Sequence, residues 1–245
     1  MSMRYKGGVL SATAPVTSSS SAKGIWTMRQ QLQAVGGTGW PKAIPAIGSA
    51  YGGGFFAGQI NVSGTIYNLV VAPKASGESL KTWGPNGTTT GVTSLINGPT
   101  NTTSLNALGS AYEAAQYCVG LNSGGGLNGY TDWYMPATNE LEVLYYFLKP
   151  TTTANNTASG SNANAVSPEP ISTNYTSGSP TQTSAGIGFR TGEIDAFASG
   201  QYWASTESTF YTTSAWNQGF NNGAQDASNY KFNSFYVRAV RRIPV

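Results

Sequence analysis

The chain of 245 residues contains no histidine and a single cysteine, Cys118. Without histidine there is no Ser-His-Asp triad, no histidine-anchored zinc site and no imidazole acid–base catalyst. A single cysteine excludes an intrachain disulfide and a thiolate cluster. Cys118 lies next to the apolar face of an expected helix, which indicates a buried small side chain rather than a reactive thiol. We therefore expect a non-enzymatic protein with no catalytic residues, no metal site and no cofactor.

Charged residues are also scarce, at 9% of the chain, with 13 basic and 10 acidic side chains. Nucleic-acid binding requires a dense basic face, and the only basic cluster is Arg238, Arg241 and Arg242. We expect these three arginines to form ion pairs or the wet side of a strand. No segment approaches the ~20 apolar residues that cross a bilayer, and the N-terminal residues contain no apolar h-region. We expect no nucleic acid partner, no membrane insertion, and folding in a cytoplasm.

The sequence is rich in glycine (31 residues), tyrosine (14 residues), serine, threonine and asparagine, which favours short strands and long loops. The stretch FAGQINVSGTIYNLVVAPK predicts a β-hairpin over residues 55–73 that turns at Ser63-Gly64. We expect its strand IYNLVVAP to lie beside the closing stretch FYVRAVRRI, within one domain of residues 42–245. The alternative is a separate small β module formed by the residues up to 104.

Two short helices are expected in this domain. In the first, Thr138 is a candidate N-cap, Glu140 lies near the positive end of the dipole, and Pro150 ends the helix. Its apolar face comprises Leu141, Leu144, Tyr145 and Leu148. A second helix is expected from Leu105, with Ser110 and Glu113 at capping-box spacing and an apolar face of Leu105, Leu108, Tyr112, Ala115 and Val119.

Residues 151–188 contain one charged residue, Glu169, in a low-complexity stretch that we name the excursion. Such composition is typical of a flexible loop, and a loop this long in a compact domain argues either against these domain boundaries or for a functional excursion. We expect it to be disordered or ordered by neighbouring subunits, so Asn162→Ala should leave stability unchanged. In the rest of the domain, the predicted core side chains are Trp133, Leu141, Leu144, Leu148, Trp203 and Trp216.

Three groups of polar residues are candidates for a catalytic, metal or ligand-binding site. Glu193 and Asp195 would share one face of a strand, as a glycosidase pair must, but an ordinary solvated pair is commoner. Calcium needs several oxygen ligands, for which Asp226 with Asn217, Asn221, Asn222 and Asn229 is a candidate set. The same segment is rich in the aromatic and amide side chains that bind at low ordering cost. Our candidate ligand-binding residues are Asn217, Asn221, Asn222, Gln225, Asp226, Asn229 and Tyr230.

The order of motifs from residue 105 to residue 245 resembles the Lcl C-terminal domain family. The motifs are a DWxxP turn at Asp132, a capped EL helix, YWASTE, a strand with AW and GF, and a final YVRAVR. The chain departs from the family in having Tyr134 and Met135 in the turn and in lacking paired cysteines. The resemblance implies an α+β, β-rich fold of the C-type-lectin-like kind, and occurrence in bacterial adhesins and phage structural proteins.

Residues 1–41 carry too little apolar area to fold alone. They include one expected short helix over residues 27–35, ended by Gly36-Gly37. The strings GVLSATAP, GIWT and QLQA resemble the N-terminal segment of phage tail and appendage proteins. That resemblance implies an extended segment that attaches the chain to other virion proteins.

Together the two resemblances predict a homotrimeric phage structural protein, located in the virion and assembled in the host cytoplasm. It would be a tail fibre, tail tip or appendage subunit whose head recognises a host-surface glycan or protein. One alternative is an architectural decoration or collar protein that binds no receptor. A third is a bacterial surface adhesin.

Overall fold

The computed structural model describes residues 17–18, 21–22 and 44–245. The chain divides into two compact units, of which the larger runs from Pro45 to Pro244. In the other unit, β1 (Thr17–Ser18) pairs antiparallel with β2 (Ser21–Ala22). The helix expected over residues 27–35 lies outside the described residues.

The first sheet of the larger unit has the order β11-β5-β4-β3 and is antiparallel throughout. Its strands are β3 (Ala50–Tyr51), β4 (Gly54–Val62), β5 (Thr65–Val71) and β11 (Val240–Pro244). The predicted hairpin is confirmed, because β4 and β5 pair around a two-residue turn at Ser63 and Gly64. Both turn residues have positive φ, 52° and 90°, as the right-handed twist of a tight hairpin requires.

The second sheet has the order β6-β10-β7-β8-β9. Its strands are β6 (Glu78–Lys81), β7 (Gln201–Glu207), β8 (Ser214–Gly219), β9 (Gln225–Tyr230) and β10 (Phe235–Arg238). Only β10 and β7 pair in parallel. The closing stretch therefore lies beside β5 only in its second half, as β11, while its first half joins the other sheet.

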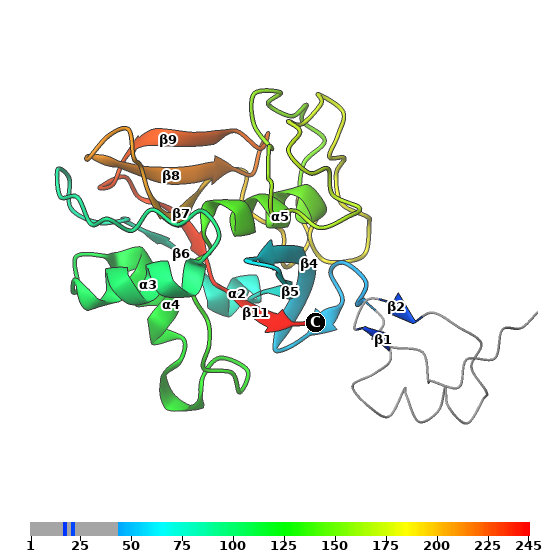
Figure 1. Cartoon of the computed structure of the whole chain (residues 1–245), viewed down its shortest axis with the longest axis horizontal. Coiled ribbons are helices and arrows are strands. Elements are labelled where there is room, and N and C mark those ends of the chain that lie inside the picture. The colour runs from blue at the N-terminus through cyan, green and yellow to red at the C-terminus, as the bar shows by residue number, and fades with distance from the viewer. Residues whose placement is uncertain (1–16, 19–20, 23–43) are drawn as a thin grey trace, which may run out of the picture. The chain divides into compact units, whose positions relative to one another are not determined.

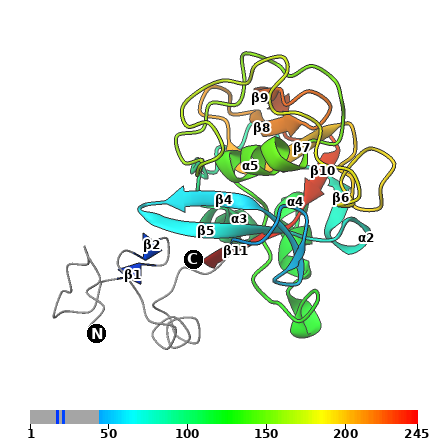
Figure 2. The ribbon, with the colours of Figure 1, turned by 90° about the vertical axis from the view of Figure 1, so that its right-hand side faces the viewer.

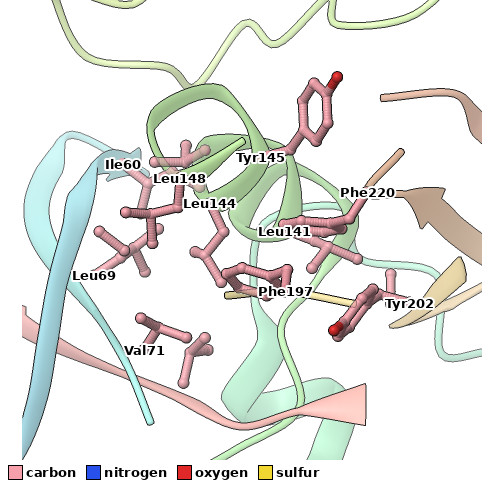
Figure 3. Close-up of a cluster of buried hydrophobic side chains, with 14 of the residues drawn as sticks. Ile60, Leu69, Val71, Leu141, Leu144, Tyr145, Leu148, Phe197, Tyr202 and Phe220 are labelled. Carbon is pink, nitrogen blue, oxygen red and sulfur yellow. The ribbon is translucent and has the colours of Figure 1, made fainter. Parts of the chain in front are cut away.

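Helix α5 (Thr138–Leu148) lies between the two sheets, with β4 and β5 on one side and β7 and β8 on the other (Figure 2). Its predicted apolar face is confirmed, since Leu141, Leu144, Tyr145 and Leu148 are all buried. Figure 3 shows Leu144 and Leu148 among the side chains of the β4–β5 hairpin, and Phe197, Tyr202 and Phe220 gathered near Leu141. The remaining predicted core residues, Trp133 and Trp203, are buried, and Trp216 is half-buried against the same core.

The start of α5 differs from the prediction. Thr138 is the first helical residue rather than the cap, and its hydroxyl bonds to no group in the described residues. The Glu140 carboxylate instead accepts the backbone N–H of Ala137 at 2.8 Å and of Gly98 at 3.2 Å. Burial raises the pKa of Glu140 to about 7 against these hydrogen bonds. The helix ends as predicted, because Lys149 is extended immediately before Pro150.

The single helix predicted from Leu105 is wrong. The region forms α3 (Gly98–Ala107) and α4 (Glu113–Gly120), separated by Gly109 at a φ of 105°. Because the helical repeat is broken there, Leu108 is 52% exposed instead of sharing an apolar face. The expected capping box is also absent, and the Glu113 carboxylate accepts the Thr82 N–H. Two shorter elements, α2 (Lys74–Gly77) and the 3-10 turn η1 (Ser123–Gly125), complete the helices of the described residues.

The excursion forms the yellow-green loops over α5 in Figure 1 and contains no helix or strand. It is nevertheless packed on the domain, with buried side chains that include Asn155, Asn162 and Tyr175. The Asn162 amide donates to the Asn139 carbonyl at 3.0 Å and to the Glu142 carboxylate at 2.7 Å. Treating Asn162 as a residue of a flexible segment is therefore wrong. In this segment, which has no helix or strand, side-chain hydrogen bonds like those of Asn162 take the place of regular backbone hydrogen bonds.

The predictions for Cys118 and for the three C-terminal arginines are confirmed. Cys118 is buried. Arg241 forms a two-pronged ion pair with Asp132, at 2.6 and 2.9 Å, while Arg238 is buried against acidic side chains and Arg242 lies 3.6 Å from the Glu140 carboxylate. Among the described helices, none combines the length and hydropathy that a bilayer span needs. The fold is of the mixed α+β, strand-rich class that the resemblance implied.

Leu144→Ala should reduce the free energy of unfolding by about 2–5 kcal/mol, because the removed atoms leave a cavity at the join of helix and sheets. The matched control is Leu108→Ala, since Leu108 is exposed in the break between α3 and α4. Thermal unfolding of both variants, followed by circular dichroism, measures the difference. Equal melting temperatures would show that α5 does not fill the centre of the core.

Candidate functional site

Three of the predicted ligand-binding residues are half-buried and also bond to the excursion. The Gln225 side-chain oxygen accepts the Gly160 N–H at 2.9 Å, and the Asn221 carbonyl accepts the Thr151 hydroxyl at 2.6 Å. The Asn222 carbonyl accepts a backbone N–H of the excursion at 2.8 Å, and its side chain accepts an N–H within its own turn. These residues are therefore structural connectors between the β8–β9 turn and the excursion.

A second group forms a polar network along β9, the edge strand of its sheet (Figure 1). The Asp226 carboxylate accepts the Ser228 hydroxyl at 2.7 Å and the Asn229 amide at 2.9 Å. Asn217, on the neighbouring strand, is buried and donates to the Asp226 carbonyl at 3.0 Å. The prediction of Asn217 as an exposed contact is wrong, whereas Asp226 and Asn229 are half-buried and reach the surface.

This arrangement brings together only part of the candidate calcium set. Asp226, Asn217 and Asn229 lie together, but Asn221 and Asn222 bind the excursion through their carbonyls. The Asp226 oxygens already accept donors from the strand, and the described part of the chain contains no cluster of three acidic, histidine or cysteine side chains. The network is built to hold a strand edge.

Four exposed aromatic side chains lie at one end of β8 and β9, and we name them the aromatic patch. Tyr230 and Phe232 are 51% and 55% exposed, and their rings stack at 5.4 Å between centroids with an interplanar angle of 14°. Phe210 and Tyr211, in the preceding β7–β8 loop, are 71% and 56% exposed. Ser214, which follows that loop, pairs with Tyr230 in the sheet register, so the two segments are neighbours. Tyr230 is the predicted residue that this surface retains.

The patch rests on a buried ion pair between Lys231 and Glu207. The Lys231 ammonium also donates to the Thr212 carbonyl at 2.8 Å and lies 5.0 Å from the Trp83 ring, while its backbone N–H bonds to the Thr213 carbonyl. Burial raises the pKa of Glu207, but the hydrogen bond from Lys231 and those from the backbone outweigh burial and leave its pKa lowered. The buried Lys231–Glu207 pair and its hydrogen bonds therefore hold in place the two loops that carry the exposed rings.

Glu193 and Asp195, the candidate glycosidase pair, have other hydrogen-bond partners. Residues 191–198 form turns rather than a strand, so the one-face argument fails for Glu193 and Asp195. Glu193 accepts the N–H groups of Gly186 and Arg190. Asp195 is buried, and its carbonyl accepts the Arg238 guanidinium at 2.6 Å. Both residues stabilise loops.

A second pair of carboxyl groups, Glu142 on α5 and Glu169 in the excursion, was not predicted. Glu142 accepts the Tyr175 hydroxyl and the Asn162 amide, each at 2.7 Å. Glu169 is buried, and neither of its oxygens accepts an N–H or O–H from a described donor. Burial, and then the contact with Glu142, raises the pKa of Glu169 to about 11. Burial also raises the pKa of Glu142 against its hydrogen bonds. Burial therefore favours the protonated form of both groups, and a proton held between them would attach the excursion to α5.

A family model described as the Lcl C-terminal domain matches residues 81–241, which is more than half of the chain. The matched segment runs from the end of β6 into β11, and contains α5, the excursion and the aromatic patch, whereas the β4–β5 hairpin precedes it. No curated protein matches the chain.

The shared proton predicts a pH dependence of stability. The pKa of Glu169 is raised from 4.5 to about 11 in the folded protein. A carboxyl group with a raised pKa contributes its full stabilisation at a pH below its unfolded-state pKa. That stabilisation is lost as the pH rises towards the folded-state pKa. Glu169→Gln keeps a permanent donor for Glu142 and removes that loss. The melting temperature of wild type should therefore fall relative to that of Glu169→Gln between pH 5 and pH 9.

Glu193→Gln is the control, because backbone N–H groups lower the pKa of Glu193 and its contribution is lost only as pH falls. The melting temperature of this control variant should not rise relative to that of wild type between neutral and alkaline pH. Parallel curves for wild type and Glu169→Gln would show that the two carboxyl groups share no proton.

Proposed function

Because the chain belongs to the Lcl C-terminal domain family, we propose that it is a non-enzymatic recognition protein with a C-type-lectin-like head. The head, Pro45–Pro244, binds a host-surface glycan or protein through the aromatic patch and the adjoining polar edge of β9. In this proposal the protein is a structural subunit of a phage virion, in a tail fibre, tail tip or appendage.

The observation that supports binding is the presence of four exposed rings on two neighbouring segments that a buried ion pair holds in place. Aromatic side chains bury a large area on binding and lose few rotatable bonds, so they are efficient contact residues. Exposed apolar groups that gather in one place are typical of interaction sites, unlike scattered single residues. The neighbouring Asp226 and Asn229 provide oxygen and nitrogen atoms that can bond to hydroxyl or amide groups of a partner.

The placement in a virion is supported by the resemblance of residues 1–41 to attachment segments of phage tail proteins. A trimer of such heads would turn weak contacts at each patch into firm attachment, because the second and third contacts become intramolecular. A competing proposal is architectural, in which the patch packs against another virion protein and binds no receptor. A bacterial surface adhesin is the third proposal, and it would use the same patch.

Replacing both stacked rings, in Tyr230→Ala/Phe232→Ala, tests the proposal. The double variant should compete at least tenfold less well than wild type for adsorption to host cells, because the stacked pair supplies the central apolar contact. Tyr230 is retained from the sequence prediction, but Asn222 is not changed because its side chain accepts the Ala224 N–H.

Leu80→Ala is the matched control, since Leu80 is exposed on β6 at the opposite edge of the same sheet. It should compete as wild type does, and all variants should keep the wild-type melting temperature. Undiminished competition by the double variant would exclude the patch as the receptor surface. If wild type itself fails to compete, the architectural proposal is favoured.

A further inference from the structure

An open groove of about 500 Å³ lies between the C-terminal part of α5 and the end of the excursion. Tyr146 and Phe147 from the helix, Ile47 from the start of the unit, and Pro180, Gln182 and Ile187 form much of its lining. A smaller hollow of about 180 Å³ adjoins it, and Tyr146 and Ser179 belong to both. The larger volume falls within the ~300–1,000 Å³ range of small-molecule sites. Neither hollow includes a residue of the aromatic patch.

The lining of the groove selects one class of ligand. No residue that lines either hollow carries a charge, so an anionic or cationic ligand would lose its hydration without gaining a partner. A purely apolar ligand would in turn cover the hydroxyl and amide groups of Ser179, Thr181 and Gln182 without bonding to them. A sugar ring satisfies both conditions, because it has an apolar face for an aromatic ring and neutral hydroxyl groups at its edge.

The two aromatic side chains provide a suitable platform. The rings of Tyr146 and Phe147 meet edge to face, with centroids 5.0 Å apart and planes at 78°. Both are half-buried, so each keeps part of its surface for a ligand. Tyr146 lines both the groove and the smaller hollow, so a saccharide chain that occupied both would contact it with two consecutive units.

The opposite wall is held in place before any ligand arrives. Lys149 donates to the Pro180 carbonyl at 3.2 Å and accepts the Thr183 N–H through its own carbonyl at 3.0 Å. The Asn155 amide bonds to the same Pro180 carbonyl at 2.9 Å, and the Gln182 amide donates to the Pro150 carbonyl at 2.6 Å. Because these bonds already order the wall, a ligand loses less free energy to loop ordering when it binds.

We propose that this groove binds a neutral saccharide, with Tyr146 as the stacking residue at its centre. This site goes beyond the proposed function, because it lies on the excursion and α5 rather than on the loops of the aromatic patch. It would recognise uncharged glycan chains whatever the partner of the patch.

A glycan array carrying neutral oligosaccharides beside their sulfated and sialylated counterparts tests this site. Wild type should bind at least one neutral oligosaccharide, and more weakly its acidic counterpart. Tyr146→Ala should lose that binding at least tenfold, whereas Tyr146→Phe, which keeps the ring, should retain most of it. Ser184→Trp, at an exposed position on the groove, should also abolish binding by filling the groove without removing a core side chain.

Binding of acidic glycans alone, or equal binding by wild type, Tyr146→Ala and Ser184→Trp, would overturn the inference. The Tyr230→Ala/Phe232→Ala variant separates it from the proposed function. If that variant loses the neutral glycan while the two groove variants retain it, the saccharide binds the aromatic patch. If it keeps the neutral glycan but no longer competes for adsorption, both sites exist.

Discussion

The burial of most of α5, from Thr138 to Tyr145 and at Leu148, is the constraint on which the rest of the structure depends. The helix lies between two sheets and beneath the excursion, so two glutamates, Glu140 and Glu142, are removed from water with it. A buried carboxyl group must be hydrogen-bonded or protonated, and here each one recruits a distant segment. The Glu140 carboxylate accepts the N–H of Gly98, at the start of α3, and the Tyr134 hydroxyl. The Glu142 carboxylate accepts the hydroxyl of Tyr175, a residue of the excursion. Loops without regular structure are thus attached to the helix by its buried carboxyl side chains.

Local patterns were sufficient to predict the elements that local forces determine. The β4–β5 hairpin follows from its turn residues and β-branched strands, and the buried face of α5 follows from the spacing of its leucines. The break at Gly109 was missed because the apolar repeat continues through it, although a glycine that needs positive φ was visible in the sequence. The excursion was missed for a different reason. Its order comes from amide side chains such as Asn155 and Asn162 that bond to distant groups, and low-complexity composition carries no record of such pairs.

The structure gives several of the predicted site residues structural partners that the sequence did not indicate. Amide side chains were predicted to contact a ligand, yet the side-chain oxygen of Gln225 accepts an N–H of the excursion. Phe210 and Phe232 were missed, because an apolar ring in a chain with few charges is usually expected in the core. A usable signal was present in the alternation Tyr230-Lys231-Phe232, since alternate residues of an extended segment face the same way. With Lys231 turned inward to Glu207, both rings must face outward.

A buried lysine lies behind each of the two surfaces and supports loops of irregular structure. Lys231 donates to two loop carbonyls under the aromatic patch, and Lys149 donates to the carbonyls of Thr153 and Pro180 behind the groove. Burial lowers the pKa of Lys149, which opposes its charge but leaves its hydrogen bonds to the loop backbone. A carbonyl acceptor is present whatever side chain a residue carries. The outward-facing residues of these loops are therefore free to change their binding chemistry while the inward bonds that hold the loops to the fold remain.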